Sequence, residues 1–238
     1  MKKLLSLHEN IKYYILPITY LRRTMNDKKI IRYVALGDSY TICEGATREE
    51  SWPCLLVKNL RNTGVPIELI ANPSVTGWTT QDLINKELPV FDASSPTFAT
   101  LLIGVNDWVQ GVSAENFYKN LNFIIDHVQG NRKKNTSEHN TNCQLILITI
   151  PDFSVTPDGP KYSKGRNIAE GITEFNNIMR AEAEKRNLKC VDIFPISQQM
   201  LGKPELVSSD NLHPSAKEYA IWETLIFPVA HDILKLHI

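Results

Sequence analysis

The sequence has few cysteines, no net charge and no long apolar run, and each absence excludes a class of protein. Its four cysteines are scattered, without a CxxC pair or clustered histidines, so we expect reduced, partly buried thiols rather than a zinc site or a dense disulfide framework. Lys plus Arg and Asp plus Glu both number 26, which removes the usual electrostatic argument for a nucleic-acid or anionic-membrane partner. Composition therefore predicts a globular protein that is free to take a small neutral ligand.

The N-terminal region is the one place that imitates a targeting segment. Residues 13–21 are mostly apolar, but Pro17 breaks them and Arg22 and Arg23 follow where small residues should mark a cleavage site. The stretch is also too short to span a bilayer, so we expect no stable membrane insertion. These features predict a cytoplasmic protein, with secretion as the alternative.

Strand-like and helix-like segments alternate from residue 30 onward. Buried strands are predicted at 30–36, 67–71, 98–103, 144–150 and 188–193. Helices are predicted after Ser51, with Pro53 in the first turn, and at 80–88, 113–128, 167–186 and 215–234, the last kinked or interrupted at Pro228. The polar stretch 130–142 is predicted to be a surface loop. This order predicts an α/β fold with a mostly parallel sheet covered on both faces, in which ligands bind beyond the carboxyl ends of the strands.

Four segments at that predicted edge carry residues of catalytic type. They are Gly-Asp-Ser-Tyr at 37–40, a small and polar run at 72–77, Gly-Val-Asn-Asp at 104–107, and Asp-Asn-Leu-His-Pro at 210–214. Each alone is also typical of an ordinary turn or helix start. Three of them follow consecutive strands, however, and the fourth supplies a histidine, so together they predict one site.

The chemistry of a serine nucleophile assigns a role to each of these residues. Ser39 needs a base, and the neutral imidazole of His213 can accept its proton while the carboxylate of Asp210 orients the ring. Asp210 and His213 are three residues apart, so both can project from one side of a turn. The backbone N–H groups of Ser39 and Gly77 and the side-chain amide of Asn106 are candidate donors to an oxyanion.

This set of blocks resembles the SGNH hydrolases, also called the GDSL esterase/lipase family, over residues 30–236. The Ser, Gly, Asn and His that name the family correspond to Ser39, Gly77, Asn106 and His213. The resemblance implies a flavodoxin-like, three-layer α/β/α fold and hydrolysis of a small-molecule carboxylic ester or thioester through an acyl-enzyme. It implies no metal and no organic cofactor. We therefore predict an SGNH hydrolase domain at 30–238, preceded by a non-catalytic extension at 1–29; a catalytically inactive ligand-binding module is the alternative.

The sequence departs from the family pattern at two positions near the nucleophile. Tyr40 replaces the Leu of the GDSL motif, and Cys43 stands where related sequences with a Gly-Asp-Ser-Tyr-Thr start often carry Gly. A side chain at Cys43 could narrow the space beside Ser39, and the alternatives are a packed thiol or, more remotely, Cys43 as the nucleophile itself. The elbow motif of classical α/β-hydrolases is absent, because position 41 is Thr.

Three further features are candidates for shaping a substrate pocket. Trp52 and Trp108 follow Ser39 and Asn106 along the chain and could form pocket walls, although packing in the core explains them equally well. The Pro-containing segment 151–160 leaves the fourth predicted strand and is a candidate lid.

Overall fold

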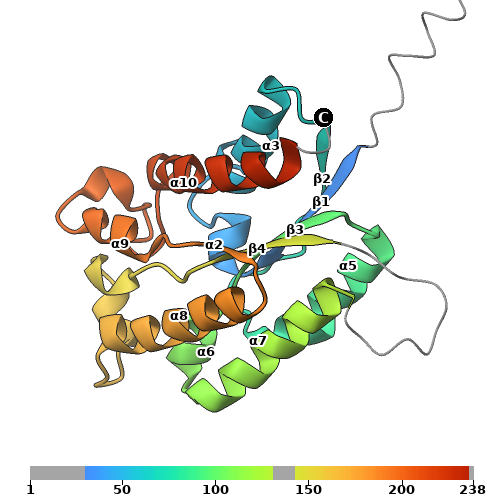
Figure 1. Ribbon diagram of the computed structural model, residues 1–238. Coiled ribbons are helices and arrows are strands. Elements are labelled where there is room, and N and C mark those ends of the chain that lie inside the picture. Colours follow the sequence, from blue (N-terminus) through green and yellow to red (C-terminus); the bar gives the residue numbers. More distant parts are fainter. Residues whose placement is uncertain (1–29, 131–142, 236–238) are drawn as a thin grey trace, which may run out of the picture.

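The computed structural model describes residues 30–130 and 143–235, which form a three-layer α/β/α fold (Figure 1). Five parallel strands make one sheet in the order β2-β1-β3-β4-β5. The strands are β1 (Ile31–Gly37), β2 (Ile67–Ala71), β3 (Phe98–Leu102), β4 (Gln144–Ile148) and β5 (Lys189–Val191). The predicted α/β class and parallel sheet are confirmed.

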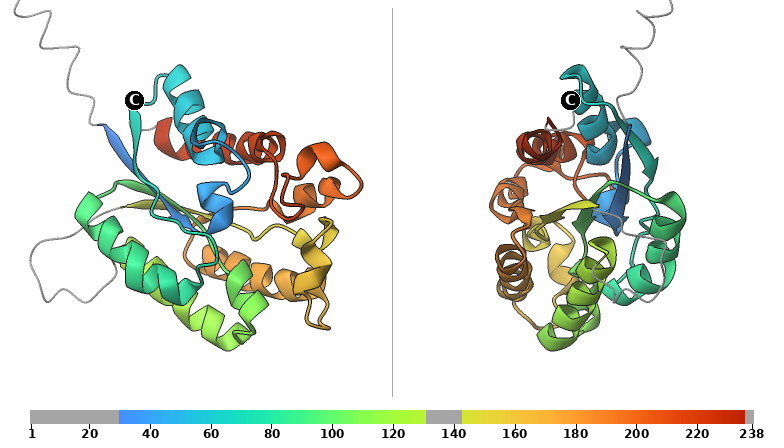
Figure 2. Two further views of the ribbon diagram at one scale, coloured as in Figure 1. Left: turned by 180° about the vertical axis from the view of Figure 1, so that it is seen from behind. Right: turned by 45° about the vertical axis from the view of Figure 1, so that its right-hand side comes forward.

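Helices cover both faces of the sheet. They are α2 (Ser39–Ile42), α3 (Trp52–Asn62), α4 (Thr80–Asp82), α5 (Leu88–Ser94), α6 (Val105–Gln110), α7 (Ala114–Val128), α8 (Ile168–Lys185), α9 (Phe194–Ser197) and α10 (Ala216–Leu234). The long helices α3 and α10 lie together on one face, and α5, α7 and α8 lie on the other (Figures 1 and 2). Five apolar residues of α7 recur at helical spacing and are fully buried, which is the pattern that predicted this helix; they are Phe117, Leu121, Ile124, Ile125 and Val128.

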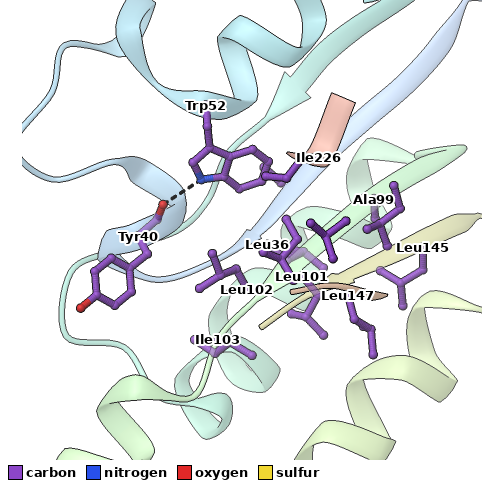
Figure 3. Close-up of a cluster of buried hydrophobic side chains, with 14 of the residues drawn as sticks. Leu36, Tyr40, Trp52, Ala99, Leu101, Leu102, Ile103, Leu145, Leu147 and Ile226 are labelled. Carbon is purple, nitrogen blue, oxygen red and sulfur yellow. Dashed lines mark hydrogen bonds between the residues drawn. The ribbon is translucent and has the colours of Figure 1, made fainter. Parts of the chain in front are cut away.

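The core is continuous from the central strands to the helices above them (Figure 3). All five residues of β3 are buried, as expected for a strand covered on both faces. Trp52 is fully buried and donates its indole N–H to the backbone carbonyl of Tyr40 over 2.9 Å. The hypothesis that Trp52 forms a pocket wall is therefore wrong, and the core-packing alternative is correct.

The structure corrects several predicted helix boundaries. The helix predicted at 80–88 is three pieces: α4, a π-helical segment η2 (Leu83–Glu87), and α5, which continues through Pro89 to Ser94. Pro89 lies in the first turn of α5, where its missing N–H costs nothing. Pro228 does not interrupt α10, and the short helix α6 was not predicted.

Some expectations concern residues outside the described parts of the chain. These are the extension at 1–29 and nearly all of the predicted loop at 130–142. All four cysteines are described and are free thiols, two buried and two half-buried, as predicted. No helix in the described residues has the length and apolar character needed to cross a membrane.

Candidate active site

Ser39 lies where β1 ends and α2 begins, at the carboxyl edge of the sheet. Asp38 caps this helix start, because its Oδ1 accepts the Tyr40 backbone N–H over 3.0 Å. The turn is tightly packed on the sheet, since a Cβ at Gly37 would collide with the Thr41 hydroxyl and the Leu102 carbonyl oxygen. A glycine is therefore required before Asp38, and the backbone around Ser39 has little freedom.

His213 and Asp210 form the acid–base pair that their spacing predicts. The Nδ1 of His213 lies 2.6 Å from Asp210 Oδ2. Asp210 Oδ1 also accepts hydrogen bonds from the Ser208 hydroxyl at 2.5 Å and from the backbone N–H groups of Leu212 and His213, each at 2.9 Å. Burial alone would raise the pKa of Asp210, but these hydrogen bonds outweigh it and hold the pKa well below its usual range.

The charge on Asp210 fixes how the His213 ring is protonated. A carboxylate can only accept, so His213 Nδ1 must carry the proton that it donates to Asp210. In the neutral ring, Nε2 is then the unprotonated nitrogen, which is the atom that a general base uses. The pair therefore presents a basic nitrogen at the side of the ring away from Asp210.

Tyr40 lies between His213 and the turn that carries Ser39. Its ring meets the His213 ring edge-on, with 5.9 Å between centroids, and meets Trp222 of α10 in the same way at 5.9 Å. The residue next to Ser39 thus packs against the imidazole. In the described part of the chain Ser39 and His213 are not hydrogen-bonded, and such contacts commonly tighten only when substrate binds.

Asn106 and Gly77, from two different blocks, meet beside this turn. The Asn106 side-chain amide donates to the Trp78 carbonyl over 2.9 Å, one residue from Gly77. An amide has two N–H bonds, so one remains for a substrate oxygen. Gly77 has φ of +86°, a conformation that favours glycine, and nothing lies within 4 Å of the position a Cβ would take. Its backbone therefore faces open space.

Two contacts that the motifs did not reveal join the Gly77 loop to the Ser39 loop. Asn72 donates its side-chain amide to the Thr41 carbonyl over 3.0 Å, and the Thr76 hydroxyl donates to Glu44 Oε2 over 2.5 Å. Polar residues in loops are common and the sequence gives no partner for them, so nothing short of the fold could pair these positions. They bring the first and second blocks to the same edge of the sheet.

Asp107, the neighbour of Asn106, fixes the loop between the second and third blocks. Asp107 is buried, and its carboxylate accepts the Thr80 backbone N–H over 2.8 Å and the Thr80 hydroxyl over 2.5 Å. Burial raises its pKa, and the Thr80 hydrogen bonds partly offset this. Asp107 therefore ties α6 to the start of α4, just after Gly77.

Replacing these two neighbours should separate catalytic from structural damage. We expect Asn106→Ala to lower kcat by about 10²–10³-fold with little change in KM, because the amide acts most strongly once the substrate oxygen carries charge. Asp107→Ala should instead lower the free energy of unfolding by about 1–3 kcal/mol, since it leaves the buried Thr80 N–H without a partner. Steady-state kinetics and melting curves measure both effects.

A matched control for Asn106 is available on α7. Asn120 is also half-buried and its amide donates to the Thr80 hydroxyl over 3.0 Å, so Asn120→Ala removes a similar group from the same loop network. It should leave kcat unchanged. An Asn106→Ala enzyme with the kcat of the original protein would remove Asn106 from the oxyanion hole.

Cys43 is a packed thiol at the end of α2. It has φ of +64°, a left-handed conformation that glycine adopts more readily, which explains the Gly of related sequences. Its sulfur lies 3.6 Å from the Tyr40 carbonyl oxygen, the side chain is buried, and burial raises the thiol pKa well above its ordinary value. A thiol held neutral in this way is a poor nucleophile, which favours the packing alternative.

The other pocket candidates are part of the packed body. Trp108 is 5% exposed, the guanidinium of Arg166 lies 3.9 Å from its ring centroid, and Gly171 has no room for a Cβ against the indole. The core-packing alternative is therefore correct for Trp108. The segment 151–160 contributes two 3₁₀ turns, and its Asp158 N–H donates to the Asn211 carbonyl over 2.9 Å. It borders the loop that carries Asp210, and its role as a lid stays a prediction.

The four blocks occur within a known family of sequences. The model of the GDSL-like lipase/acylhydrolase family matches residues 35–221. The chain belongs to this family. This GDSL-like acylhydrolase is accordingly an ester-bond hydrolase, and no curated protein sequence matches it significantly.

Solved structures confirm the fold of this GDSL-like acylhydrolase. It is similar to a Clostridium thermocellum family 3 carbohydrate esterase, with TM-score 0.68 and 18% identity, covering 87% of this chain and 98% of that one. It also resembles the Pseudoalteromonas esterase EstA (TM-score 0.63, 22% identity, 86% and 98% covered) and an Enterococcus faecalis lipase/acylhydrolase (TM-score 0.64, 22% identity, 86% and 97% covered). At these identities the likeness establishes the fold alone.

Proposed function

We propose that the protein is a serine esterase that cleaves a small-molecule carboxylic ester or thioester through an acyl-enzyme, with Ser39 as nucleophile, His213 as base and Asp210 as the residue that orients it. The observation that carries the proposal is the 2.6 Å contact between His213 Nδ1 and Asp210, one aromatic ring away from the Ser39 turn. His213 and Asp210, which the sequence predicts to act together, are hydrogen-bonded, and the His213 ring packs against Tyr40, the neighbour of Ser39.

The proposed reaction has two halves. Ser39 Oγ attacks the carbonyl carbon of the ester while its proton passes to His213 Nε2, and the carbonyl oxygen becomes an oxyanion. His213 then protonates the leaving alcohol or thiol as the bond to the acyl group breaks. In the second half His213 takes a proton from water, which attacks the acyl-enzyme, and returns it to Ser39 Oγ.

The oxyanion needs donors that are already in place. The Ser39 N–H belongs to the first turn of α2 and has no partner within that helix, the Gly77 N–H lies on an open loop, and Asn106 retains one amide N–H. Fixed donors of this kind stabilise developing charge without the cost of reorienting. Ser39, Gly77 and Asn106 are therefore our proposed oxyanion hole.

Covalent labelling tests the nucleophile directly. A phosphonate ester reagent that mimics the tetrahedral intermediate should modify Ser39, as mass spectrometry of the digested protein would show, and should stop hydrolysis of model esters in proportion. A panel of esters of increasing acyl length would then define the substrate class. Labelling of another residue, or binding of esters with no hydrolysis in any of them, would contradict the proposal, the latter in favour of an inactive binding module.

The rate should depend on pH through the base. Because only the neutral imidazole can accept the Ser39 proton, kcat/KM should rise with pH through one acidic limb and then level off. Initial rates with a soluble ester across the pH range would measure it. An unchanged limb in a His213 variant with measurable residual activity would assign the titration to another group.

A further inference from the structure

Beneath the nucleophile turn the protein buries acidic groups that the proposed mechanism does not use. Asp38, Glu87 and Asp107 expose at most 1% of their surface, and none of them forms an ion pair within residues 30–130 and 143–235. Burying an unpaired carboxylate is costly, and burying several near one another is more costly still. Protons must therefore be bound in this cluster when the protein is folded.

Of these three acidic residues, Glu87 is the one that contacts the Ser39 turn from a different element of the fold. It lies at the end of η2, the π-helical segment, and its Oε2 accepts the backbone N–H of Gly37 over 3.0 Å. Gly37 is the last residue of β1 and is followed by Asp38 and Ser39. The far side of Gly37 has no room for even a Cβ, because Thr41 and Leu102 lie against it. Glu87 thus holds Gly37 from one side, and Thr41 and Leu102 confine it from the other.

Two oxygens of the Asp38–Glu87 pair are left without partners. Asp38 Oδ1 binds Tyr40 and Glu87 Oε2 binds Gly37, but Asp38 Oδ2 and Glu87 Oε1 are both buried and unpartnered. Two carboxylates offer only acceptors to each other. A proton on one of them supplies the donor that the pair lacks.

We propose that Glu87 is a positioning residue for the nucleophile, which holds the Gly37 N–H in place as a neutral, protonated acid. The inference deepens the proposed function, since it assumes that the turn carries the reactive serine. Glu87 acts through the backbone and does not touch the substrate.

Burial and the neighbouring carboxyls favour protonation of the pair, and they outweigh the backbone hydrogen bonds that oppose it. Burial raises the pKa of Glu87 well above its ordinary value and Asp38 raises it further; the Gly37 hydrogen bond opposes this. Burial likewise raises the pKa of Asp38 to about 8, and Asp107 of α6 adds to the shift. Burial, and to a smaller degree Asp38, raises the pKa of the Tyr40 and Tyr219 phenols, so both are neutral.

Two substitutions of Glu87 distinguish a protonated acid from a charged one. Glu87→Gln keeps an oxygen for the Gly37 N–H and cannot ionise, so it should retain the kcat of the original enzyme. Glu87→Leu removes the acceptor, and we expect kcat to fall by up to about 10²-fold with little change in KM, the effect of a small misplacement at the reacting atoms. Loss of kcat in Glu87→Gln equal to that in Glu87→Leu, or no loss in either, would overturn the proposal.

The pH dependence of stability tests the proton without any activity assay. A carboxyl whose pKa is higher in the folded state than in the unfolded state stabilises the protein most at low pH. As pH rises from the unfolded-state pKa to the folded-state pKa, the folding equilibrium constant falls about tenfold per pH unit for each such carboxyl. Denaturant unfolding at pH values above 4.5, the ordinary pKa of a glutamate, should therefore show a shallower fall of stability with rising pH in Glu87→Gln than in the original protein. An unchanged slope would overturn the proposal even if Glu87→Leu fails to fold.

Glu223 provides the matched control. It is buried and has an unpartnered Oε1 and a pKa that burial raises. Its helix, α10, covers the other face of the sheet from α5 (Figure 1). Glu223→Gln should flatten the pH dependence of stability but leave kcat unchanged. Activity retained in Ser39→Ala, together with the expected change in the pH dependence of stability in Glu87→Gln, would contradict the proposed function. That result would still support a buried proton on Glu87.

Discussion

Ser39→Ala should reduce kcat for model esters by roughly 10⁶-fold while the protein remains folded. The substitution removes one oxygen atom from a side chain that is 3% exposed, and it leaves the Asp38 cap and the backbone of the turn in place. What is lost is the atom that we propose forms the acyl-enzyme. Kinetics with an activated ester, together with a melting curve, would measure the two effects separately.

His213→Ala should be almost as damaging, and the double variant no worse than either single variant. Members of a catalytic triad act as one unit, so their losses do not add. Additive losses in the double variant would show that Ser39 and His213 act in separate steps. Residual turnover near that of the original enzyme in Ser39→Ala would remove Ser39 as the nucleophile.

Asp210→Asn should lower kcat by roughly 10⁴-fold, the loss seen when a triad carboxylate is replaced by its amide. The amide can still accept the backbone N–H groups of Leu212 and His213, but it offers His213 Nδ1 no charge and can present an N–H instead. The ring would then favour the wrong tautomer and lose the partner that stabilises its protonated form. Single-turnover measurements would show the loss in the acylation step.

The same variant should change stability in a pH-dependent way. The folded-state pKa of Asp210 is depressed, so the ionised group stabilises the protein above the unfolded pKa of 3.8, and this contribution is lost as pH falls through the folded-state value. Asp210→Asn should therefore melt below the original protein at neutral pH, with the difference shrinking in acid. A constant difference in melting temperature at all pH values would contradict this.

A second His–Asp pair in the chain offers a control. His127 of α7 lies 2.6 Å from Asp92 of α5, on the helix layer away from Asp210. Asp92→Asn breaks a contact of the same kind and length, and it should leave kcat unchanged. A large loss there would mean that the effect of Asp210→Asn reports on folding rather than on His213.

The sequence predicts the parts of this fold that repeat a simple pattern. The strands of the sheet are short apolar runs, and the amphipathic spacing of α7 defines one buried face, so both could be found without tertiary information. The Asp210 and His213 pair could be predicted for a related reason, since its geometry depends on a local turn. The predicted length of the last strand was less accurate, because β5 is an edge strand of three residues.

Other parts of the site depend on contacts between distant segments. A lone glutamate in an amphipathic segment indicates a solvent-facing position, so the burial of Glu87 was not predicted. Its orientation depends on the π-helical turn, whose hydrogen-bond register the 3.6-residue pattern does not reveal. Trp52 is the opposite case, a side chain that the sequence suggested for the pocket. It is close to Ser39 in the sequence, but the fold places its ring in the core.

The position of α10 has a consequence for the order in which the enzyme is made. This helix begins just after His213, and it covers the same face of the sheet as α3, which follows Ser39. Synthesis proceeds at about 5–20 residues per second, so a growing chain displays the serine for many seconds before the ribosome has added the histidine. During that interval the nascent chain has the proposed nucleophile without its proposed base, and it lacks helix α10. Under the proposed mechanism, acyl transfer therefore has to wait until His213 has been added to the chain and has folded beside Ser39.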